Sequence, residues 1–438
     1  MYDIIYIGGG LNYAGAIVAA KSGKKVALIE RDMNQLGGVC LHKGCIPSKM
    51  FLHYANTIFE SKNEIFTGAL ELNMQTLAEK KEALLTSVTK VVQKQCANVE
   101  LIEGEAKVIA PHQVAVNGDV LKAEHIVIGT GSRHFIPEGI AYNKTDIITS
   151  DEVLMLKQLP QKILIYGVGA IGLEMASFFA TAGCEVTLVN RKDKLLKNAH
   201  EKIQLQMRSQ LEKIGVTILD NHPIAKAKST SRGVHVTFED GTSLYSPLML
   251  VATGRIANSD VVAFDGIAVK KAIVTDELFE TTQVKHYAIG DCNGKLQLAH
   301  AARAQTLFVT QQILGKNPRT LNLENVVKFI HTLPMSYAFV GKTKTMLEAQ
   351  NISYKESLVT LNQFTYSVYN HANHGMMISY VDDEGFILGG EIFSPHAEEL
   401  IATIAMSLAG EMDANEAKRT IFAHPTFSEA LERTFYRL

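Results

Sequence analysis

The sequence contains no tryptophan and only five cysteines among its 438 residues. So few cysteines in so long a chain exclude a disulfide scaffold of the small secreted type. A surplus of one charge is also missing, because 43 basic residues stand against 45 acidic ones and the formal net charge is −2. A broad nucleic-acid-binding face needs a basic surface, so the composition argues against nucleic acid as a partner.

Long uninterrupted hydrophobic runs are missing as well. The longest apolar stretch, Ile163–Gly183, approaches the length of a membrane span, but it contains Glu174 and several glycines. A buried strand followed by a buried helix explains this stretch better. The first residues enter an apolar strand pattern directly, without the basic region or cleavage site of a signal peptide. We therefore expect no membrane partner and a cytoplasmic location.

The length predicts about three domains of roughly 150 residues each, and the first of them carries a recognisable pattern. A strand over Asp3–Ile7 precedes the glycine cluster Gly8–Gly10, and a second strand over Lys25–Ile29 ends at Glu30. This spacing is typical of a βαβ unit in which glycines let the backbone approach a pyrophosphate and the acid holds a ribose hydroxyl. The alternative is a tight turn without a ligand. Tyr13 occupies the third glycine position, so close packing of helix on strand must be achieved differently.

The pattern recurs after a strand over Lys162–Tyr166, which predicts two dinucleotide-binding folds in one chain. The glycines of this complete second motif are Gly167, Gly169 and Gly172. The second strand of the unit, Glu185–Val189, is followed by Asn190 and Arg191 rather than by an acid. A carboxylate there favours the free 2′-hydroxyl of NAD, whereas an arginine accommodates a 2′-phosphate. Arg191 therefore favours NADPH over NADH, with a solvated basic turn as the alternative.

Two cysteines, Cys40 and Cys45, lie five residues apart in the most informative stretch of the sequence. In an ideal α-helix, Cα atoms at this spacing are roughly 8–9 Å apart, whereas a disulfide needs about 4.4–6.8 Å. A bond between them requires an interrupted helix, and Gly44 offers the freedom for a bend. Pro47 suits a first helical turn, which would place Cys45 at a helix N-terminus, where the dipole favours a thiolate. Lys49 adds positive charge on the same helical face.

The cysteine pair could also be two buried structural residues or half of a zinc site. No second Cys/His pair with metal-ligand spacing occurs, so no metal site is predicted. A redox-active pair accounts for the stretch best. The remaining cysteines are predicted to be small buried hydrophobic residues; they are Cys96, Cys184 and Cys292.

A series of short motifs occurs along the chain in a characteristic order. They are the Gly8 cluster, the cysteine stretch Gly37–Lys49, Gly129–Ser132, the second glycine motif with Glu174, Ala252–Arg255, Ala288–Asp291, Leu298–His300 and His424–Glu429. In these motifs the sequence resembles, from end to end, the FAD-dependent pyridine nucleotide–disulfide oxidoreductases. Within that family it is most similar to dihydrolipoamide dehydrogenases and their mercuric-reductase-like relatives.

The resemblance implies FAD on the first fold and NADPH, or less favourably NADH, on the second. The residues that it implies for FAD are Gly8, Gly10, Glu30, Lys49, Ala106, Gly131, Asp291 and Ala299. Those implied for the pyridine nucleotide are Gly167, Gly169, Gly172, Glu174, Asn190, Arg191 and Gly254. Lys49 and Glu174 match a charged pair beside the flavin ring. By the same resemblance, Cys45 faces the flavin and Cys40 exchanges with substrate.

A second catalytic pair is expected at His424 and Glu429. Thiol exchange needs a base that takes a proton from the incoming dithiol and returns it to the leaving sulfur, and an imidazole suits that task. A carboxylate five residues away can orient the ring and stabilise its charged form. The resemblance implies that this pair reaches the disulfide of the other subunit, so a homodimer is expected.

The expected fold is α/β, with two Rossmann-like dinucleotide-binding domains, the NAD(P) domain inserted in the FAD domain, and a C-terminal α+β dimerisation domain. The expected bounds are 1–148 for the FAD domain, 149–258 for the NAD(P) domain, 259–324 for the returning FAD segment and 325–438 for the dimerisation domain.

The expected function is electron transfer between NAD(P)H, FAD, the Cys40–Cys45 disulfide and a small-molecule disulfide or lipoyl-type substrate. His42 and Lys43, which replace the usual residues between the cysteines, add charge beside the exchange thiol. Three alternatives use the same chain differently. They are a metal-ion reductase of the mercuric type, an NAD(P)H:quinone or oxygen oxidoreductase, and a non-catalytic redox sensor.

Overall fold

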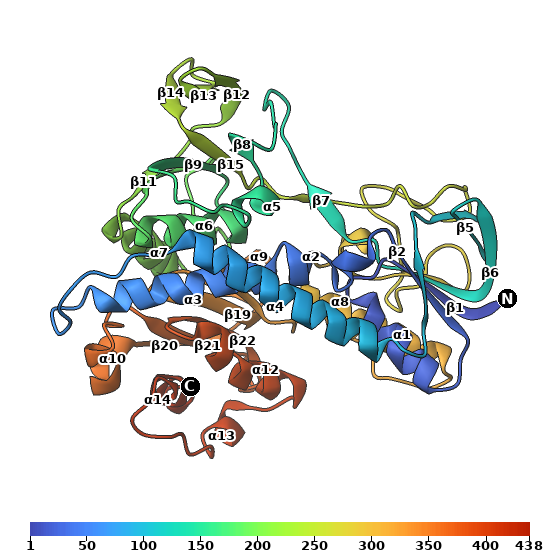
Figure 1. The fold of residues 1–438 in the computed structure, drawn as a ribbon. Helices are drawn as coiled ribbons and strands as arrows, with labels where there is room; N and C mark the ends of the chain where they lie inside the picture. Colours follow the sequence, from blue (N-terminus) through green and yellow to red (C-terminus); the bar gives the residue numbers. More distant parts are fainter. The chain divides into compact units, whose positions relative to one another are not determined.

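The computed structural model describes all residues, 1–438, and they form two compact units (Figure 1). The first unit consists of Met1–Ser48, Gln75–Phe135 and Gly254–Leu323. The second consists of Lys49–Met74, Ile136–Thr253 and Glu324–Leu438. Each unit is therefore assembled from three separate stretches of the chain.

A seven-stranded sheet forms the centre of the first unit, in the order β3-β2-β1-β6-β5-β4 with β17 also paired to β6. Its strands are β1 (Tyr2–Ile7), β2 (Val26–Glu30), β3 (Glu100–Glu103), β4 (Lys107–Ala110), β5 (Gln113–Val116), β6 (Asp119–Ile128) and β17 (His286–Ala288). Strands β3, β2, β1, β6 and β17 run parallel, whereas β5 pairs antiparallel with β4 and with the first half of β6.

The central strands are apolar at almost every position because both faces of the sheet are covered. Ile4 and Tyr6 point to one face, where they join the core formed with α1 (Asn12–Lys21) and α8 (Ala299–Ile313). Ile5 and Ile7 point to the other face, as the two-residue period of a strand requires. Helices α1 and α8 pack against each other (Figure 1).

The first unit also contains helices outside its sheet and a short two-stranded ribbon. They are η1 (Met33–Gln35), α2 (Gly38–His42), η2 (Gly290–Asn293), most of α4 (Met74–Gln95), and a two-stranded ribbon of β7 (Ser132–His134) and β16 (Arg255–Ala257). Helix α3 (Cys45–Ser61) begins in the first unit and continues in the second.

The second unit contains a five-stranded, fully parallel sheet in the order β11-β10-β9-β15-β8. Its strands are β8 (Ile147–Ile148), β9 (Lys162–Tyr166), β10 (Glu185–Val189), β11 (Val216–Leu219) and β15 (Leu248–Val251). The helices of this part are α5 (Ser150–Val153), α6 (Ala170–Thr181) and α7 (Glu201–Lys213). A three-stranded antiparallel sheet joins β12 (Ile224–Thr230), β13 (Gly233–Phe238) and β14 (Ser243–Ser246).

The apolar stretch Ile163–Gly183 is the buried strand β9 followed by the buried helix α6, as the sequence predicted. Glu174 lies on this helix and is only 6% exposed. No helix in the structure combines the length and the apolar character that crossing a membrane requires.

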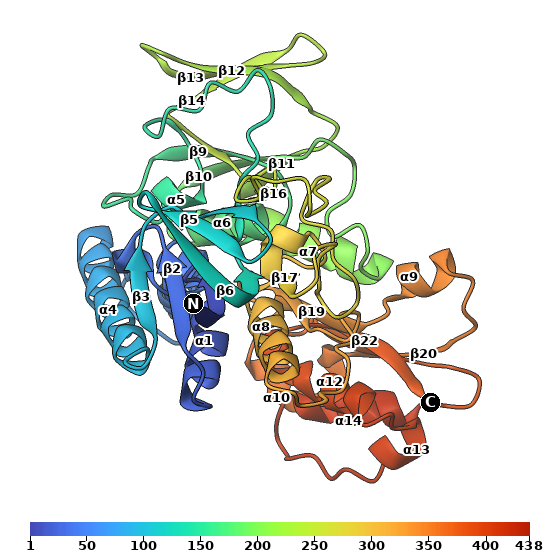
Figure 2. The same ribbon diagram turned by 90° about the vertical axis from the view of Figure 1, so that its right-hand side faces the viewer.

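The C-terminal part of the second unit is an antiparallel sheet in the order β18-β19-β22-β21-β20. Its strands are β18 (Lys328–Ile330), β19 (Ser336–Gly341), β20 (Lys355–Thr360), β21 (Met376–Val381) and β22 (Ile387–Ser394). Its helices are α9 (Lys344–Ala349), η3 (Leu361–Gln363), α10 (Thr365–Tyr369), α11 (Ala397–Leu400), α12 (Ala402–Ala409), α13 (Ala414–Ala417) and α14 (Ser428–Tyr436). Figure 2 shows α12 and α14 on one side of this sheet, on which both pack.

These sheets confirm the predicted fold class. The sheet of the first unit takes β6 and β17 from either side of the segment that forms the parallel sheet of the second unit, so the second fold is inserted in the first. The C-terminal α+β layer follows both. The residue bounds expected for the domains stay a prediction.

Candidate active site

The first glycine motif forms a tight turn between β1 and α1, and its first position, Gly8, requires glycine. Gly8 has φ +92°, and a Cβ added there would lie 2.4 Å from the carbonyl oxygen of Gly129. The Gly9 N–H donates to Oε2 of Glu30 at 2.6 Å, so the predicted ribose-binding acid lies directly over the turn. No side chain caps the N-terminus of α1. A side-chain-free turn before an uncapped helix N-terminus, with an acid beside it, fits the pyrophosphate and ribose of FAD.

The missing third glycine is compensated by neighbouring residues. Asn12 is fully buried, donates from Nδ2 to the Ile7 carbonyl oxygen at 3.1 Å and accepts from Oγ1 of Thr306 at 3.1 Å. At Gly15 an added Cβ would lie 2.5 Å from Thr306 Oγ1, so α1 approaches α8 closely there. Tyr13 packs against the core on this face of the sheet. The departure from the glycine pattern therefore leaves the βαβ unit intact.

Asp291, predicted to contact FAD, is held by two residues that were not among the predicted site residues. Ser132 donates from Oγ to Oδ2 of Asp291 at 2.5 Å. Arg255 in turn donates from Nε to Oγ of Ser132 at 2.7 Å. Both residues are the last residues of motifs that the sequence analysis identified, Gly129–Ser132 and Ala252–Arg255. Their place in these motifs is the sequence signal from which they could have been predicted.

The other residues predicted for FAD lie in the first unit, except Lys49. Ala106 is buried, Gly131 has φ +69°, and Ala299 is the first residue of α8. Gly10 lies close to Gly38, where an added Cβ would approach the Gly10 Cα at 2.7 Å.

The second glycine motif forms the same kind of turn between β9 and α6. Gly167 has φ +116° and an added Cβ there would lie 2.4 Å from the Ala252 carbonyl oxygen. At Gly172 the Cβ would lie 1.8 Å from the carbonyl oxygen of Gly167, so the helix touches the turn. Gly169 stands at the N-cap of α6 with open space around it and no capping side chain. Gly254, predicted for the same site, belongs to the first unit, where it has φ +116°.

Asn190 is turned into the fold. It is 3% exposed, donates from Nδ2 to Oδ1 of Asp220 at 2.9 Å, and accepts the Lys192 N–H at 3.1 Å. Arg208 holds the other oxygen of Asp220 at 2.5 Å. Arg191, by contrast, is exposed. The turn after β10 therefore presents the basic side chains of Arg191, Lys192 and Lys194 to solvent, with the acidic side chain of Asp193 among them.

The two cysteines lie on either side of a helix break, as their spacing required. Helix α2 ends at His42, Lys43 leaves helical geometry with φ −139°, and α3 begins at Cys45. Cys40 is half-buried and Cys45 is exposed at the first position of its helix. Glycine is needed at position 44, but not for the conformational freedom that the sequence analysis expected. Gly44 is absent from the residues with positive φ, but an added Cβ would lie 2.9 Å from the Val39 carbonyl oxygen.

The imidazole of His42 is anchored within the first unit. Its Nε2–H donates to the Leu36 carbonyl oxygen at 3.0 Å and lies 3.4 Å from Oγ1 of Thr89. These contacts fix the ring, and the expected effect of His42 and Lys43 on the exchange thiol stays a prediction.

The three remaining cysteines are buried, as predicted. Burial raises the pKa of the Cys96, Cys184 and Cys292 thiols to about 11. They stay protonated at neutral pH and are poor nucleophiles.

Lys49 and Glu174 form an ion pair within the second unit, with Lys49 Nζ 2.6 Å from Oε1 of Glu174. The Lys49 side chain is 31% exposed and that of Glu174 is 8% exposed. Oε1 of Glu174 also accepts the backbone N–H of His331 at 3.0 Å, a contact that the sequence did not predict.

His424 and Glu429 also form the predicted pair. Nδ1 of His424 lies 2.7 Å from Oε1 of Glu429, and the imidazole side chain is 81% exposed. The Thr426 N–H donates to Oε2 of the same carboxylate at 3.0 Å. Burial acts to raise the pKa of Glu429, but the hydrogen bonds from His424 and Thr426 outweigh burial and lower the pKa. The ionised carboxylate holds Nδ1–H and leaves Nε2 able to accept a proton.

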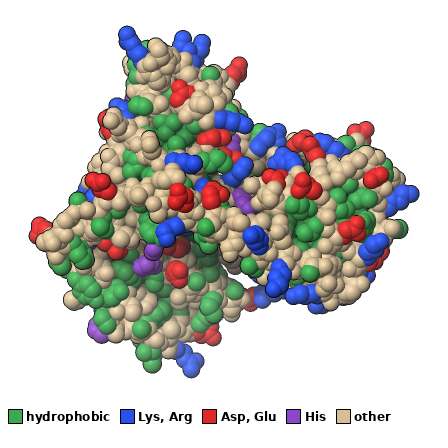
Figure 3. Space-filling view, viewed as in Figure 1, with side chains coloured by type: hydrophobic (Ala, Val, Ile, Leu, Met, Phe, Trp, Pro, Cys, Tyr) green, Lys and Arg blue, Asp and Glu red, His purple; other side chains and the backbone are tan.

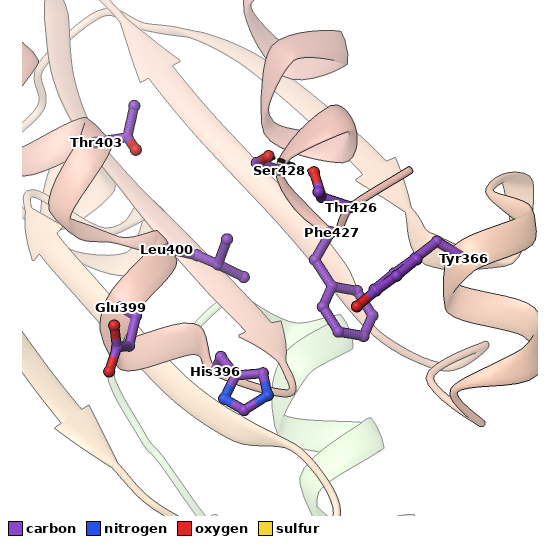
Figure 4. A pocket seen from close by; sticks show the side chains of 8 residues that line it. All are labelled: Tyr366, His396, Glu399, Leu400, Thr403, Thr426, Phe427 and Ser428. Carbon is purple, nitrogen blue, oxygen red and sulfur yellow. Dashed lines mark hydrogen bonds between the residues drawn. The ribbon is translucent and has the colours of Figure 1, made fainter. Parts of the chain in front are cut away.

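A cavity of about 480 Å³ adjoins this pair in the C-terminal part (Figure 4). Its lining residues are Tyr366, His396, Glu399, Leu400, Thr403, Thr426, Phe427 and Ser428. The rings of Tyr366 and Phe427 meet edge to face with centroids 4.9 Å apart. Aromatic rings, hydroxyl groups, the carboxylate of Glu399 and the imidazole of His396 therefore line this cavity.

Two glycine turns that fit dinucleotides, two cysteines separated by a helix break and an imidazole–carboxylate pair suit a nucleotide-dependent thiol–disulfide oxidoreductase. The family model described as pyridine nucleotide-disulphide oxidoreductase matches residues 2–306, and the model of that family's dimerisation domain matches residues 327–435. The chain belongs to the pyridine nucleotide-disulphide oxidoreductases.

Named relatives extend over the whole chain. Dihydrolipoyl dehydrogenase of Bacillus subtilis (strain 168) is 30% identical, with 98% of this chain and 96% of the relative covered. The HOCl-induced flavoprotein disulfide reductase RclA from Escherichia coli superimposes with a TM-score of 0.90 at 26% identity, covering 99% of each chain. LpdA from Mycobacterium tuberculosis shares the fold, with a TM-score of 0.92 at 23% identity over 100% of this chain and 99% of its own.

These matches confirm the family, the fold class and the general activity expected from the sequence. The protein is an enzyme, a flavoprotein disulfide oxidoreductase similar to dihydrolipoyl dehydrogenases, and its family uses FAD with NADH or NADPH. A dimerisation domain is present at its C-terminus.

Proposed function

We propose that the enzyme reduces a small-molecule disulfide with NADPH, through a redox-active disulfide formed by Cys40 and Cys45. The observation that carries this proposal is the helix break between α2 and α3, which removes the regular helix that would keep the two cysteines apart. Bound FAD supplies the two-electron chemistry that links the pyridine nucleotide to the disulfide. Overall, NADPH, one proton and the substrate disulfide give NADP⁺ and two thiols.

The chain's own residues hold the cofactor in the first unit. Gly8 and Gly10 provide the side-chain-free turn for the pyrophosphate, and Glu30 provides the ribose acceptor. Asp291 provides a carboxylate for the ribityl or pyrophosphate region, fixed by Ser132 and Arg255.

Cys45 is suited to carry a thiolate. It is exposed and occupies the first position of the 17-residue helix α3, where the dipole and unpaired N–H groups favour a negative sulfur. The Cys40 thiolate attacks the substrate disulfide, which releases one thiol and leaves a mixed disulfide on Cys40. The Cys45 thiolate then attacks the Cys40 sulfur, which releases the second thiol and re-forms the Cys40–Cys45 disulfide.

His424 is the proposed acid–base group of that exchange. Glu429 holds the ring through Nδ1, so Nε2 can give a proton to the leaving sulfur and accept one in the reverse direction. In the proposed homodimer, His424 of one subunit serves the cysteine pair of the other.

Exposed apolar side chains in the C-terminal part support dimerisation. Met406 is 76% exposed and Ile421 is 95% exposed. Hydrophobic side chains also gather over the region of α10 in Figure 3, where Val368 and Tyr369 are exposed. Apolar patches of this kind are typical of interfaces. A second copy of the chain is the partner that the dimerisation domain favours.

The preference for NADPH rests on the turn after β10. A 2′-phosphate would meet the exposed Arg191, while Asn190 is engaged inside the fold and offers no carboxylate to a 2′-hydroxyl.

The substrate class is a small disulfide or lipoyl-type disulfide, the latter supported by the likeness to a dihydrolipoyl dehydrogenase. We place the enzyme in the cytoplasm, where such disulfides are kept reduced.

Steady-state oxidation of NADPH and NADH tests the proposal on the purified yellow protein, with lipoamide, glutathione disulfide, other small disulfides, quinone and Hg(II) as acceptors. Cys45→Ser should abolish disulfide reduction and retain bound FAD, whereas Cys96→Ser should behave as the wild type. Unchanged disulfide turnover in Cys45→Ser contradicts the mechanism. Turnover with quinone or oxygen that survives Cys40→Ser while no disulfide is reduced would favour an oxidoreductase that does not use the cysteines.

His424→Gln separates the two half-reactions. Reduction of the substrate disulfide should fall by about 10²–10⁴-fold because the acid–base group is lost. Reduction of bound FAD by NADPH should stay within about twofold, since His424 has no part in it. Equal losses in both half-reactions would assign His424 to another role.

A further inference from the structure

Glu174 has a second fixed donor besides Lys49. Its Oε1 accepts from Lys49 Nζ at 2.6 Å and from the backbone N–H of His331 at 3.0 Å. Two residues further along, the Leu333 N–H donates to Oγ of Ser177 on α6 at 2.7 Å. The segment between β18 and β19 is therefore bound to α6 at two points, one of which is the carboxylate of the ion pair.

The strand just before this segment, β18, also contacts Lys49. Nζ of Lys49 lies 5.4 Å from the ring centroid of Phe329 on β18, a cation–π distance. Both partners of the Lys49–Glu174 pair are thus held by residues 329–331. The position of this segment decides how the pair is held.

The imidazole of His331 is itself anchored. Its Nδ1 lies 3.1 Å from Oε1 of Glu398 on α11, and the two side chains are 25% and 18% exposed. Burial acts to raise the pKa of Glu398, but the hydrogen bond and electrostatic attraction of His331 outweigh burial and lower the pKa. Glu398 is therefore a carboxylate at neutral pH, and its hydrogen bond with the ring is charge-assisted.

We propose that His331 and Glu398 are positioning residues for the Lys49–Glu174 pair. The Glu398 carboxylate fixes the imidazole, and the fixed residue keeps its backbone N–H on Oε1 of Glu174. A carboxylate with two donors on one oxygen has little freedom to rotate away from Lys49. The effect on catalysis rests on the proposed function, in which the Lys49–Glu174 pair acts beside the flavin.

Four variants distinguish the contribution of the His331 imidazole from that of the Glu398 charge. His331→Leu removes the imidazole and keeps the backbone N–H, whereas His331→Asn retains a side-chain N–H near the place of Nδ1. Glu398→Gln keeps the shape and removes the charge, and the double variant His331→Leu/Glu398→Gln removes both groups. The matched controls are His371→Asn and Glu384→Gln, because neither residue contacts Glu174 or Lys49 in the structure.

Hydrogen exchange tests the positioning without relying on turnover. In the FAD-loaded protein, the backbone amide of residue 331 should exchange at least about tenfold faster in Glu398→Gln and His331→Leu than in the wild type, since its bond to Glu174 opens more often. Both controls should match the wild type. Unchanged exchange at residue 331 in Glu398→Gln and His331→Leu overturns the proposal.

Anaerobic stopped-flow reduction by NADPH tests the consequence. The rate of flavin reduction should fall about three- to tenfold in His331→Leu and Glu398→Gln, while the dissociation constant of NADPH stays within about twofold. His331→Asn should recover part of the loss, and the double variant His331→Leu/Glu398→Gln should be no slower than His331→Leu. Independent, multiplicative losses contradict a shared role. If the wild type reduces no disulfide, the proposed function fails, and the exchange experiment still decides the positioning.

Discussion

The buried carboxylate of Glu391 in the second unit is predicted to make a large contribution to the free energy of unfolding. Glu391 on β22 is fully buried and accepts three hydrogen bonds. They come from the hydroxyl of Tyr337 at 2.7 Å, the hydroxyl of Tyr380 at 2.8 Å and the backbone N–H of His200 at 2.9 Å. His200 caps α7 of the dinucleotide fold, whereas the other three residues belong to the C-terminal sheet. The carboxylate therefore joins the two parts of the second unit.

Glu391→Leu should lower the free energy of unfolding by at least about 3 kcal/mol. Each buried donor left without a partner costs about 1–3 kcal/mol, and three donors lose theirs. Burial and the nearby carboxylate raise the pKa of both tyrosines, so their hydroxyls stay protonated. Each hydroxyl therefore remains a hydrogen-bond donor that needs an acceptor. Glu391→Gln keeps an acceptor oxygen and gains an amide donor for a tyrosine oxygen, so its loss should be only about 1–2 kcal/mol.

The pH dependence of the same variants has a definite sign. Burial raises the pKa of Glu391 above its ordinary value, so the folded chain binds the proton more tightly than the unfolded chain. The associated stability is fully present below the unfolded pKa of about 4.3 and is lost as the pH rises through the folded value. Glu391→Gln should lack this loss.

Urea unfolding followed by far-UV circular dichroism, from pH 4.5 to 8, measures both effects. Hydrogen exchange in β22 reports whether the change is local to the cluster. If Glu391→Leu is within about 1 kcal/mol of Glu391→Gln at every pH, the three donors are satisfied without the carboxylate and the reasoning is refuted.

Three further predictions concern the dinucleotide site, its selectivity and acid stability. Gly172→Ala should weaken NADPH binding at least about tenfold and leave the FAD content unchanged, because its Cβ would lie 1.8 Å from the Gly167 carbonyl oxygen; titration calorimetry measures this, and unaltered affinity contradicts it. Arg191→Ala should reduce the kcat/KM ratio of NADPH to NADH about tenfold, and an unchanged ratio removes Arg191 from 2′-phosphate recognition. Burial lowers the pKa of His286, whose Nδ1–H donates to the Val284 carbonyl oxygen at 2.9 Å. The unfolded chain therefore binds its proton more readily, and stability should fall as the pH drops below about 6.5, a loss that His286→Gln should not show in urea titrations.

Local sequence patterns predicted those features whose partners are close along the chain. The glycine turns and the helix break between Cys40 and Cys45 lie within a few residues of the signal that reveals them. His424 and Glu429 are also close in sequence, but their pairing was expected chiefly from the resemblance to the family. Even there the physical reason could be misjudged. Gly44 is needed because a side chain would collide with the Val39 carbonyl oxygen, a contact that spacing alone does not show.

Contacts between distant parts of the chain were predicted only by resemblance or were missed. The Lys49–Glu174 pair spans 125 residues and was expected because the family has one. The bond from Ser132 to Asp291 spans 159 residues, and that from His331 to Glu174 spans 157. Periodicity and spacing describe neighbours in sequence, so they do not encode such pairs. The second donor on Glu174, which carries our further inference, could be found only in the structure.

The two glycine motifs show what their third glycine is for. In the second motif the helix touches the turn, and any side chain at Gly172 would overlap the Gly167 carbonyl oxygen. Tyr13 at the equivalent position means that α1 cannot make the same contact with its turn. Asn12 instead bridges the helix to the Ile7 carbonyl oxygen, while Gly15 lets α1 approach α8. The fold therefore requires that the helix N-terminus be supported above the turn, and either a glycine contact or an amide bridge can provide that support. A motif search that insists on the third glycine would reject this βαβ unit, although the unit is intact.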